Sequence, residues 1–203
     1  MNTKTLLSTG ILIPVVFWLS TFIGGFIHGG YNHLTGTISE LGAIGTRSEP
    51  LMATLTMFGA VLSMFFIIGL YRACKQLGLS TIPVYTLPAF TIMMGWAAMF
   101  HSGNRLHATA GPIFLLLYPG TLLVIILWRG KQELVSVRLL SLVSLVIMLL
   151  LFLRFVPSVQ NNYPGLIQRF AHLGWSVWFV FLSTSLIKLI AVQEQKQRQF
   201  TLF

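Results

Sequence analysis

The stretch "LMATLTMFGAVLSMFFIIGLY", Leu51 to Tyr71, contains no charged residue over its 21 positions. An α-helix rises about 1.5 Å per residue, so a helix of this length spans the roughly 30 Å hydrocarbon core of a bilayer. The run is too long for a buried element of a soluble domain in a chain of 203 residues. The stretch therefore predicts a transmembrane helix.

Five more apolar blocks flank this stretch, and each is close to the length of a membrane span. Hydrophobic residues make up 55% of the chain and charged residues only 8%, which is typical of a polytopic membrane protein. We predict an all-α membrane protein, a single transmembrane domain over residues 1–203 with six helices in one bundle. The five further blocks are Thr5 to Ile27, Ile82 to Phe100, Ala108 to Trp128, Leu139 to Phe155 and Phe170 to Ile190.

The apolar blocks argue against β-barrel strands and against a cleavable signal peptide. A β-barrel needs strands of about 10 residues in which apolar and polar side chains alternate, whereas these blocks are apolar on every side. The first block has a longer apolar run than the roughly 7–15 residues of a signal-peptide core, and no A-x-A-like cleavage site follows it. We therefore interpret Thr5 to Ile27 as an uncleaved helix.

The positions of lysine and arginine predict the orientation of the bundle. With a cytoplasmic N-terminus, nine of the 13 cationic residues fall on the inner side and four on the outer side. We expect a protein of the inner or plasma membrane with both termini cytoplasmic. This asymmetry, with attraction to anionic inner-leaflet lipids, explains the net charge of +9, so we expect membrane lipids and not nucleic acid as partners. The inner cations are Lys4, Arg72, Lys75, Arg129, Lys131, Arg138, Lys188, Lys196 and Arg198, and the outer ones are Arg47, Arg105, Arg154 and Arg169.

The longest connection, His28 to Pro50, carries acidic residues in a chain that has only four. Within it, "LTGTISELGA" (Leu34 to Ala43) contains an S/T-x-x-E capping box, with Thr37 as N-cap and Glu40 reaching back to the backbone N–H of Thr37. This pattern predicts a short helix or re-entrant turn at the outer membrane surface. Two interpretations of Glu40 follow: its carboxylate only caps this helix, or it also faces Arg169 or a ligand.

All five histidines fall on the outer side of this topology. Two of them flank the short turn "SGNRL" between the third and fourth helices, and a third shares one broad helical face with the glutamine four residues and the arginine three residues before it. Ionisable groups at membrane depth are costly, and they usually face a bundle interior or a wet cavity. We expect a ligand site formed by Glu40, His101, Arg105, His107, Gln168, Arg169 and His172, with His28 and His33 as interfacial loop residues.

Several segments of the chain resemble one known family. They are "HLTGTISELGAIG", "PLMATLTMFGAVL", "RLHATAGPIFLLLYPG" and "GLIQRFAHLGWSVWF", in this order over nearly the whole chain. The sequence is similar to the bacterial and archaeal membrane family called domain of unknown function 998, and the I-S-E-L-G and G-L-x-Q-R blocks are the most specific parts of the match. The resemblance implies a fold and a site but no activity. It places Ser39, Glu40, Leu41, Gly42, His107, Gln168 and Arg169 on the family's motif positions.

The function that we favour is a site for an anionic lipid headgroup or a small polar ligand at the outer membrane face. The positive N-terminal end of the last helix and Arg169 both favour an anion, and His107 and Glu40 complete the expected lining.

Other classes of function stay open. The first is an intramembrane hydrolase or transferase acting on a lipid, in which histidines bind zinc or act as bases. A carrier of one haem between two outer histidines and a transporter are further alternatives. The catalytic candidates are Glu40, His107, His172 and Ser39, the candidate zinc ligands are His101, His107 and His172, and the candidate haem ligands are His107 and His172.

Overall fold

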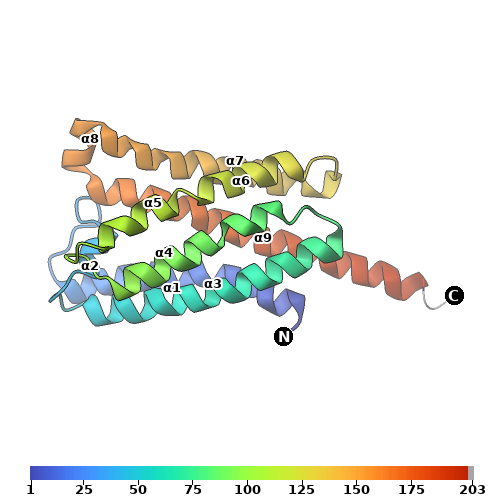
Figure 1. Ribbon diagram of the computed structural model, residues 1–203, viewed down its shortest axis with the longest axis horizontal. Coiled ribbons are helices and arrows are strands. Elements are labelled where there is room, and N and C mark those ends of the chain that lie inside the picture. Colours follow the sequence, from blue (N-terminus) through green and yellow to red (C-terminus); the bar gives the residue numbers. More distant parts are fainter. Residues whose placement is uncertain (201–203) are drawn as a thin grey trace.

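The computed structural model describes residues 1–200, which form a bundle of helices (Figure 1). Within this range, six helices are long and apolar enough to cross a membrane, which confirms the predicted all-α fold. Two short helices, α2 (Ile38–Leu41) and α8 (Pro157–Asn162), lie in connections. The six spans are α1 (Thr3–His28), α3 (Glu49–Leu77), Ile82–Met99, His107–Leu127, Gln132–Phe155 and α9 (Pro164–Phe200).

Three of the spans contain short 3₁₀-helical segments (η). The break between α5 and α6 lies at Leu115, four residues before Pro119. The proline ring clashes with the carbonyl group at that position, and its nitrogen has no hydrogen to donate. The segments are η1 (Ile82–Thr86) and α4 (Pro88–Met99); η2 (His107–Thr109), α5 (Ala110–Phe114) and α6 (Leu117–Leu127); and η3 (Gln132–Leu134), α7 (Val135–Leu149) and η4 (Leu150–Phe155).

The spans close into a ring that α9 completes between α7 and α1. α1 contacts α3 and α9, α4 contacts α3 and α5, and α7 contacts α6 and α9. α9 also contacts α3, and it runs through the centre of the view in Figure 1. Its buried face carries three of the largest side chains of the core, Trp175, Trp178 and Phe179.

Helices approach most closely where a glycine stands at a crossing. A methyl group added at Gly69 would lie 2.8 Å from the backbone nitrogen of Leu7, and one at Gly174 would lie 2.8 Å from the carbonyl oxygen of Ser144. Small residues allow such contacts between backbones, which are common in membrane bundles. These two crossings fix α3 against α1 and α9 against α7.

Three spans extend several residues beyond the ranges predicted from the sequence. The second continues to Leu77 rather than ending at Tyr71. The fifth begins at Gln132 rather than at Leu139, and the last covers Pro164–Phe200 rather than 170–190. With 37 residues, α9 is about 55 Å long, well beyond the thickness of a hydrocarbon core. Its C-terminal turns project past the other helices in Figure 1. Polar residues continue a helix outside the membrane, so the apolar runs underestimate its length.

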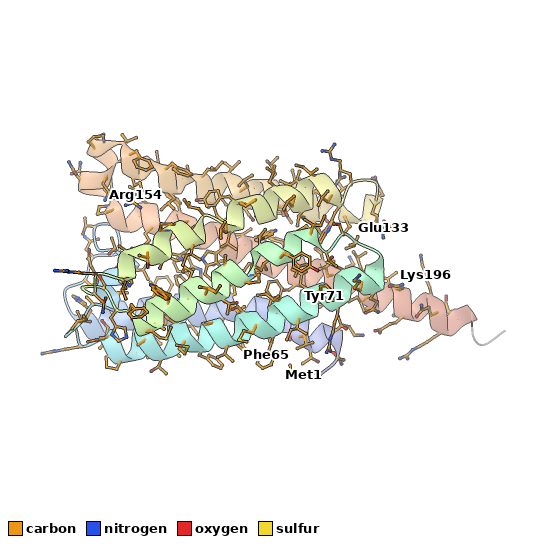
Figure 2. All side chains as sticks on the ribbon, in the orientation of Figure 1. Met1, Phe65, Tyr71, Glu133, Arg154 and Lys196 are labelled. Atoms are coloured by element: carbon orange, nitrogen blue, oxygen red, sulfur yellow. The ribbon has the colours of Figure 1, made fainter. Side chains whose placement is uncertain are left out.

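The start of α1 and the end of α9 lie at the same end of the bundle (Figure 1). The opposite end, which we call the histidine end, holds the first connection (residues 29–48) and the connection after α4 (residues 100–106). Arg154 lies at the histidine end, and Glu133 and Lys196 lie at the other (Figure 2). Many large apolar side chains on the flanks of the bundle are exposed. Exposed apolar flanks and six apolar spans indicate a multi-pass membrane protein.

Candidate functional site

A cavity of about 500 Å³ lies inside the histidine end of the bundle. Its walls come from α1, α3, α4, α5, η4 and α9, together with the first connection. Apolar side chains form much of the lining, including Phe17, Met52, Met93, Met94, Phe114 and Ile167. Of the residues predicted to form a ligand site, the structure brings four to this lining: His101, His107, Gln168 and His172. Ser39 also lines the cavity.

The first turns of α9 hold the first connection against the cavity. Gln168 Oε1 accepts the backbone N–H of Ile38 at 2.6 Å, and Gln168 Nε2 donates to Ser39 Oγ at 3.0 Å. The backbone N–H of Leu166 donates to the carbonyl oxygen of Leu34 at 3.0 Å. The cover of the cavity is therefore attached to α9 by both side-chain and backbone hydrogen bonds.

The short helix predicted in this connection is α2. Thr37 caps it, because its Oγ1 accepts the backbone N–H of Glu40 at 3.3 Å. The carboxylate of Glu40 is exposed and has no hydrogen-bond or ion-pair partner among residues 1–200. Neither the predicted bond back to Thr37 nor a contact with Arg169 is formed, so Glu40 lies apart from the other candidate residues.

Arg169 lies beside the cavity and binds the first connection instead of facing a ligand. Its Nη1 donates to the carbonyl oxygens of Gly36 and Gly165, both at 2.9 Å. Its Nη2 donates to Tyr31 Oη at 2.9 Å and to His33 Nδ1 at 2.8 Å. Burial raises the pKa of Tyr31 above its usual 10.0, against the lowering effect of Arg169. Burial and then the charge of Arg169 lower the pKa of His33 below its usual 6.5.

These contacts correct the expectation that His33 is a simple interfacial loop residue. Its neutral ring accepts a hydrogen bond from Arg169, and its lowered pKa favours that neutral form. Each of the four terminal N–H groups of Arg169 has a partner in the chain. We call Arg169, Tyr31, His33 and Gly36 the arginine clamp.

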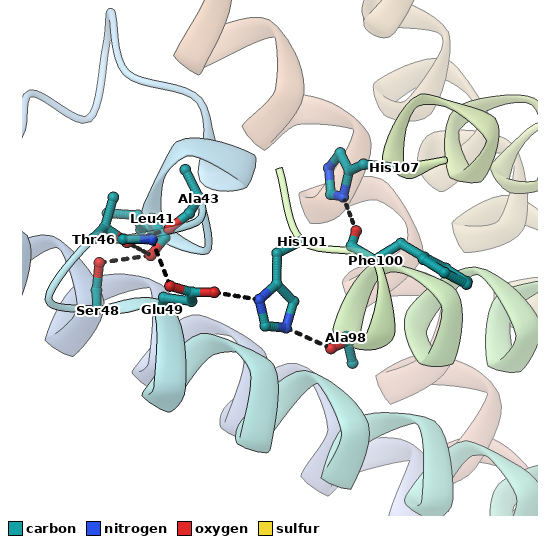
Figure 3. A network of polar contacts seen from close by, with 10 residues as sticks. Leu41, Ala43, Thr46, Ser48, Glu49, Ala98, Phe100, His101 and His107 are labelled. Carbon is teal, nitrogen blue, oxygen red and sulfur yellow. Dashed lines mark hydrogen bonds and ion pairs between the residues drawn. The ribbon is translucent and has the colours of Figure 1, made fainter. Parts of the chain in front are cut away.

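A second polar group joins α3 to the connection after α4 (Figure 3). Glu49 Oε1 lies 2.5 Å from His101 Nδ1, and Glu49 Oε2 accepts the backbone N–H of Gly45 at 2.6 Å. His101 Nε2 lies 2.8 Å from the carbonyl oxygen of Ala98. Both ring nitrogens face oxygen atoms, so either both carry hydrogen or Glu49 holds a proton; both arrangements make the pair electrically neutral. His101 has no ring nitrogen left for a ligand.

His107 keeps one ring nitrogen free. Its Nδ1 lies 2.7 Å from the carbonyl oxygen of Phe100, which is a pure acceptor, so Nδ1 carries the hydrogen (Figure 3). In a neutral imidazole the other nitrogen is then an acceptor. Nε2 of His107 has no partner among residues 1–200, and the residue lines the cavity.

His172 has the opposite arrangement. The indole N–H of Trp175 donates to His172 Nδ1 at 2.9 Å, so Nδ1 is an acceptor and Nε2 carries the hydrogen of the neutral ring. The ring packs against Phe17, with the ring centroids 4.5 Å apart, and faces Phe114 at 6.0 Å. Nε2 of His172 has no partner in the described part of the chain.

The structure does not bring the other candidates to the cavity, and it gives the zinc alternative no geometric support among residues 1–200. Arg105 and His28 are outside the lining. Within residues 1–200, no group of three His, Cys, Asp or Glu side chains is arranged to hold a metal ion. Both ring nitrogens of His101 are engaged, so the three candidate zinc ligands offer only two free nitrogens, one on His107 and one on His172. Zinc sites usually have three or four protein ligands. The haem alternative stays a prediction.

The comparison with family models returned one match. The family described as "Protein of unknown function (DUF998)" matches residues 11–185. The chain belongs to the DUF998 family. No curated protein and no solved structure matched the chain. In this DUF998 protein the two most specific blocks of the sequence are in direct contact, because Gln168 of "GLIQR" binds Ile38 and Ser39 of "ISELG".

Two residues, one in the Glu49–His101 pair and one in the arginine clamp, were not predicted from the sequence. Glu49 carries a usable signal, because it is one of only four acidic residues and directly precedes Pro50 at the start of a span. Tyr31 carries none, because a tyrosine in an interfacial connection is ordinary in a membrane protein. The acceptor that fixes His107 is a backbone carbonyl group, which any residue at position 100 supplies. In this DUF998 chain, only the tertiary structure shows that the carbonyl group of Phe100 orients His107.

Proposed function

We propose that the cavity binds the head group of a membrane amphiphile whose acyl chain leaves toward the bilayer between α5 and η4. The observation that carries the proposal is the exposure of apolar lining residues at the C-terminal end of α5 and on η4. Leu115 is 39% exposed, Phe152 is 43% exposed and Phe155 is 73% exposed, and all three line the cavity. They lie within apolar spans, so their exposed surfaces face lipid when the protein is in a membrane.

The size and composition of the cavity support this proposal. Sites for small ligands in proteins have volumes of about 300–1,000 Å³ and are mostly apolar, with a few polar groups that fix the orientation of the ligand. The cavity, at about 500 Å³, has this character. Its polar groups come from the first connection, from the connection after α4 and from α9, so they gather where a head group at the membrane surface lies.

The structure changes which residues support a lipid site. From the sequence, we expected Arg169 and Glu40 to attract an anionic headgroup. Arg169 is instead engaged by the arginine clamp, and Glu40 is exposed outside the lining. The proposal therefore rests on the cavity and on the free nitrogens of His107 and His172.

A cavity-filling variant tests the proposal. Ala97 on α4 lines the cavity, and Ala191 on α9 is equally half-buried but lies near the opposite end. We expect the wild-type protein, purified in mild detergent, to carry one amphiphile per chain by native mass spectrometry and lipid extraction. Ala97→Phe should lose it and Ala191→Phe should keep it, with both variants folded by thermal denaturation. Equal amphiphile content in the two folded variants would contradict the proposal.

The hydrolase alternative has less support from the geometry. Ser39 Oγ accepts a hydrogen bond from Gln168, and no hydrogen bond joins Ser39 to a histidine among residues 1–200. A serine nucleophile needs a base within hydrogen-bond reach. His107 Nε2 is a free acceptor, so a base is present without an activated nucleophile beside it.

We further infer that the histidine end faces away from the cytoplasm, because nine of the 13 cations lie toward the other end or the connections near it. The native cysteine, Cys74, is buried. A single cysteine introduced at the exposed Asn162 should therefore react with a membrane-impermeant maleimide from outside intact cells. Labelling only after the cytoplasmic side is opened would reverse this orientation.

A further inference from the structure

The hydrogen positions on the two free histidines define what a ligand must offer, if the cavity binds an amphiphile as proposed above. Nδ1 of His107 is committed to the carbonyl oxygen of Phe100, so Nε2 presents a lone pair to the cavity. Nδ1 of His172 is committed to the indole N–H of Trp175, so Nε2 presents an N–H group. The cavity therefore contains one fixed acceptor and one fixed donor, each without a partner in residues 1–200.

These assignments resist change because each locking group has only one hydrogen-bonding role. A carbonyl oxygen cannot donate, and an indole N–H cannot accept. A hydrogen on Nδ1 of His172 would face the indole hydrogen and leave Trp175, which is fully buried, without an acceptor. Unsatisfied buried donors cost free energy, so the fold fixes which tautomer each neutral ring adopts.

The charges around the cavity cancel or lie at its edge. The Glu49–His101 pair is electrically neutral in either protonation state. The guanidinium group of Arg169 is engaged by the arginine clamp and is not part of the lining. Arg154 lines the cavity but is exposed, with its guanidinium group 5.9 Å from the ring centroid of exposed Phe155. The enclosed part of the cavity therefore has no unpaired charge that could offset the free-energy cost of desolvating a charged head group.

We infer that the amphiphile has an uncharged head group that bears hydroxyl groups, such as a glycerol ester or a long-chain alcohol. A hydroxyl group donates one hydrogen bond and accepts two, so it can donate to Nε2 of His107 and accept from Nε2–H of His172. An ester can only accept, so it satisfies His172 and leaves His107 without a partner. A phosphate brings a charge that the enclosed part does not compensate.

Three probes with the same oleoyl chain separate these possibilities. They are 1-oleoylglycerol, which donates and accepts; methyl oleate, which only accepts; and 1-oleoyl-lysophosphatidate, which is charged. Delipidated full-length protein is titrated with each probe, as a mole fraction of one detergent, and the bound fraction is read by native mass spectrometry. We expect 1-oleoylglycerol to bind about three- to tenfold more tightly than either other probe, which corresponds to one hydrogen bond or to the desolvation of a charge.

Two variants assign the preference to the two histidines. His107→Ala should weaken 1-oleoylglycerol about three- to tenfold and leave methyl oleate unchanged, because methyl oleate never bonded to His107. Trp175→Phe keeps an aromatic ring, although a smaller one, and removes the indole N–H that locks His172; Trp175 does not line the cavity. It should weaken both 1-oleoylglycerol and methyl oleate about two- to fivefold.

Nitrogen-15 spectra of histidine-labelled protein give a readout that a loss of packing does not produce. The wild-type protein should show the Nδ1–H tautomer for His107 and the Nε2–H tautomer for His172. In Trp175→Phe, the His172 signals should shift toward a mixture of tautomers while those of His107 stay unchanged.

The possible outcomes separate this inference from the proposed function. Tighter binding of lysophosphatidate than of 1-oleoylglycerol would overturn the inference and leave an amphiphile site standing. Equal weakening of all three probes by folded His107→Ala would also overturn it. Failure of all three probes to bind the folded wild-type protein would remove the proposed function itself. If the wild-type protein prefers 1-oleoylglycerol and His107→Ala abolishes that preference, the result supports both this inference and the proposed function.

Discussion

The arginine clamp and the histidine pair, which is His107 and His172, both lie at the histidine end of the bundle, but their hydrogen-bonding groups are satisfied within the chain to different degrees. Arg169 uses all four of its terminal N–H groups on partners within the protein. His107 and His172 each use one ring nitrogen and leave the other facing a cavity. From the sequence, the arginine looks like the stronger ligand group, because it carries a permanent charge. The comparison teaches that unused hydrogen-bonding capacity, more than charge, distinguishes a candidate binding residue from a structural one here.

If this distinction holds, substitutions in the clamp change stability, and substitutions in the histidine pair change ligand binding. The clamp joins the first connection to α9, and several residues of that connection also line the cavity. A broken clamp is therefore expected to loosen the cover of the cavity as well as lower stability.

The largest effect is expected at Gly165, where α9 meets the first connection. A methyl group there would overlap the carbonyl oxygen of Gly36, which is also a clamp acceptor for Arg169. Gly165→Ala should lower the free energy of unfolding by at least about 2 kcal/mol, because it forces the two backbones apart and stretches that hydrogen bond. Chemical denaturation in one detergent measures the change.

Gly111 on α5 is the matched control for this substitution, since an added methyl group there meets nothing within 4 Å. Gly111→Ala should be neutral or stabilising by up to about 1 kcal/mol, as expected from helix propensity. Similar losses in both variants would mean that the contact of Gly165 with the first connection has no special importance.

Arg169→Lys separates the geometry of the clamp from its charge. Lysine keeps the positive charge, but a single ammonium group cannot reach the four acceptors that the planar guanidinium group spans. We expect a loss of about 1–2 kcal/mol in unfolding free energy, with the exposed Arg105→Lys as the control near zero. Full retention of stability in Arg169→Lys would show that the charge, and not the clamp, is what this position contributes.

The fold could be predicted from the sequence because its main signal is local. An uncharged run such as Leu51 to Tyr71 has one stable arrangement in a bilayer, so the number of spans follows directly. The ends of the spans could not be placed as well, because residues such as Gln132 and Pro164 continue a helix through water, where composition gives no length signal.

The site was predictable only as a region. The histidines gather at one end of any six-span arrangement, and His101, His107 and His172 do line one cavity. Their individual roles depend on partners distant in sequence or in the backbone: Glu49 lies 52 positions from His101. The same holds for Arg169, whose partner Tyr31 is 138 positions away. No spacing pattern carries that information.

The pH dependence of the clamp gives a smaller effect. His33 accepts from Arg169 only when neutral, and its pKa lies below the usual 6.5 in the folded protein. A group whose folded pKa is lowered contributes stability that is fully present above the unfolded pKa and is lost as the pH falls through the folded one. The wild-type protein should therefore lose stability as the pH falls from about 7 toward 5, by a modest amount because His33 is partly exposed.

His33→Gln tests this assignment, because the glutamine side-chain oxygen can accept from Arg169 but does not titrate in this range. Between pH 7.5 and pH 5, the Tm of the variant should fall less than the Tm of the wild type does. His28→Gln, which alters a histidine outside the clamp, should keep the wild-type slope. Identical slopes in all three proteins would place the titrating group elsewhere.

The smallest effect is expected at Glu40, the acidic residue of "LTGTISELGA". Its carboxylate is exposed and has no partner among residues 1–200, while its backbone N–H is held by Thr37. Glu40→Gln should therefore change the free energy of unfolding by less than about 0.5 kcal/mol. Because Arg169 is satisfied by carbonyl oxygens, Tyr31 and His33, removal of the Glu40 charge strands no partner. The double variant Glu40→Gln with Arg169→Gln should thus lose the sum of the two single losses, within the roughly 0.5 kcal/mol that independent sites show. A double variant that is clearly more stable than this sum would reveal an ion pair between the two residues and would return Arg169 from the clamp to the charge interactions first expected of it.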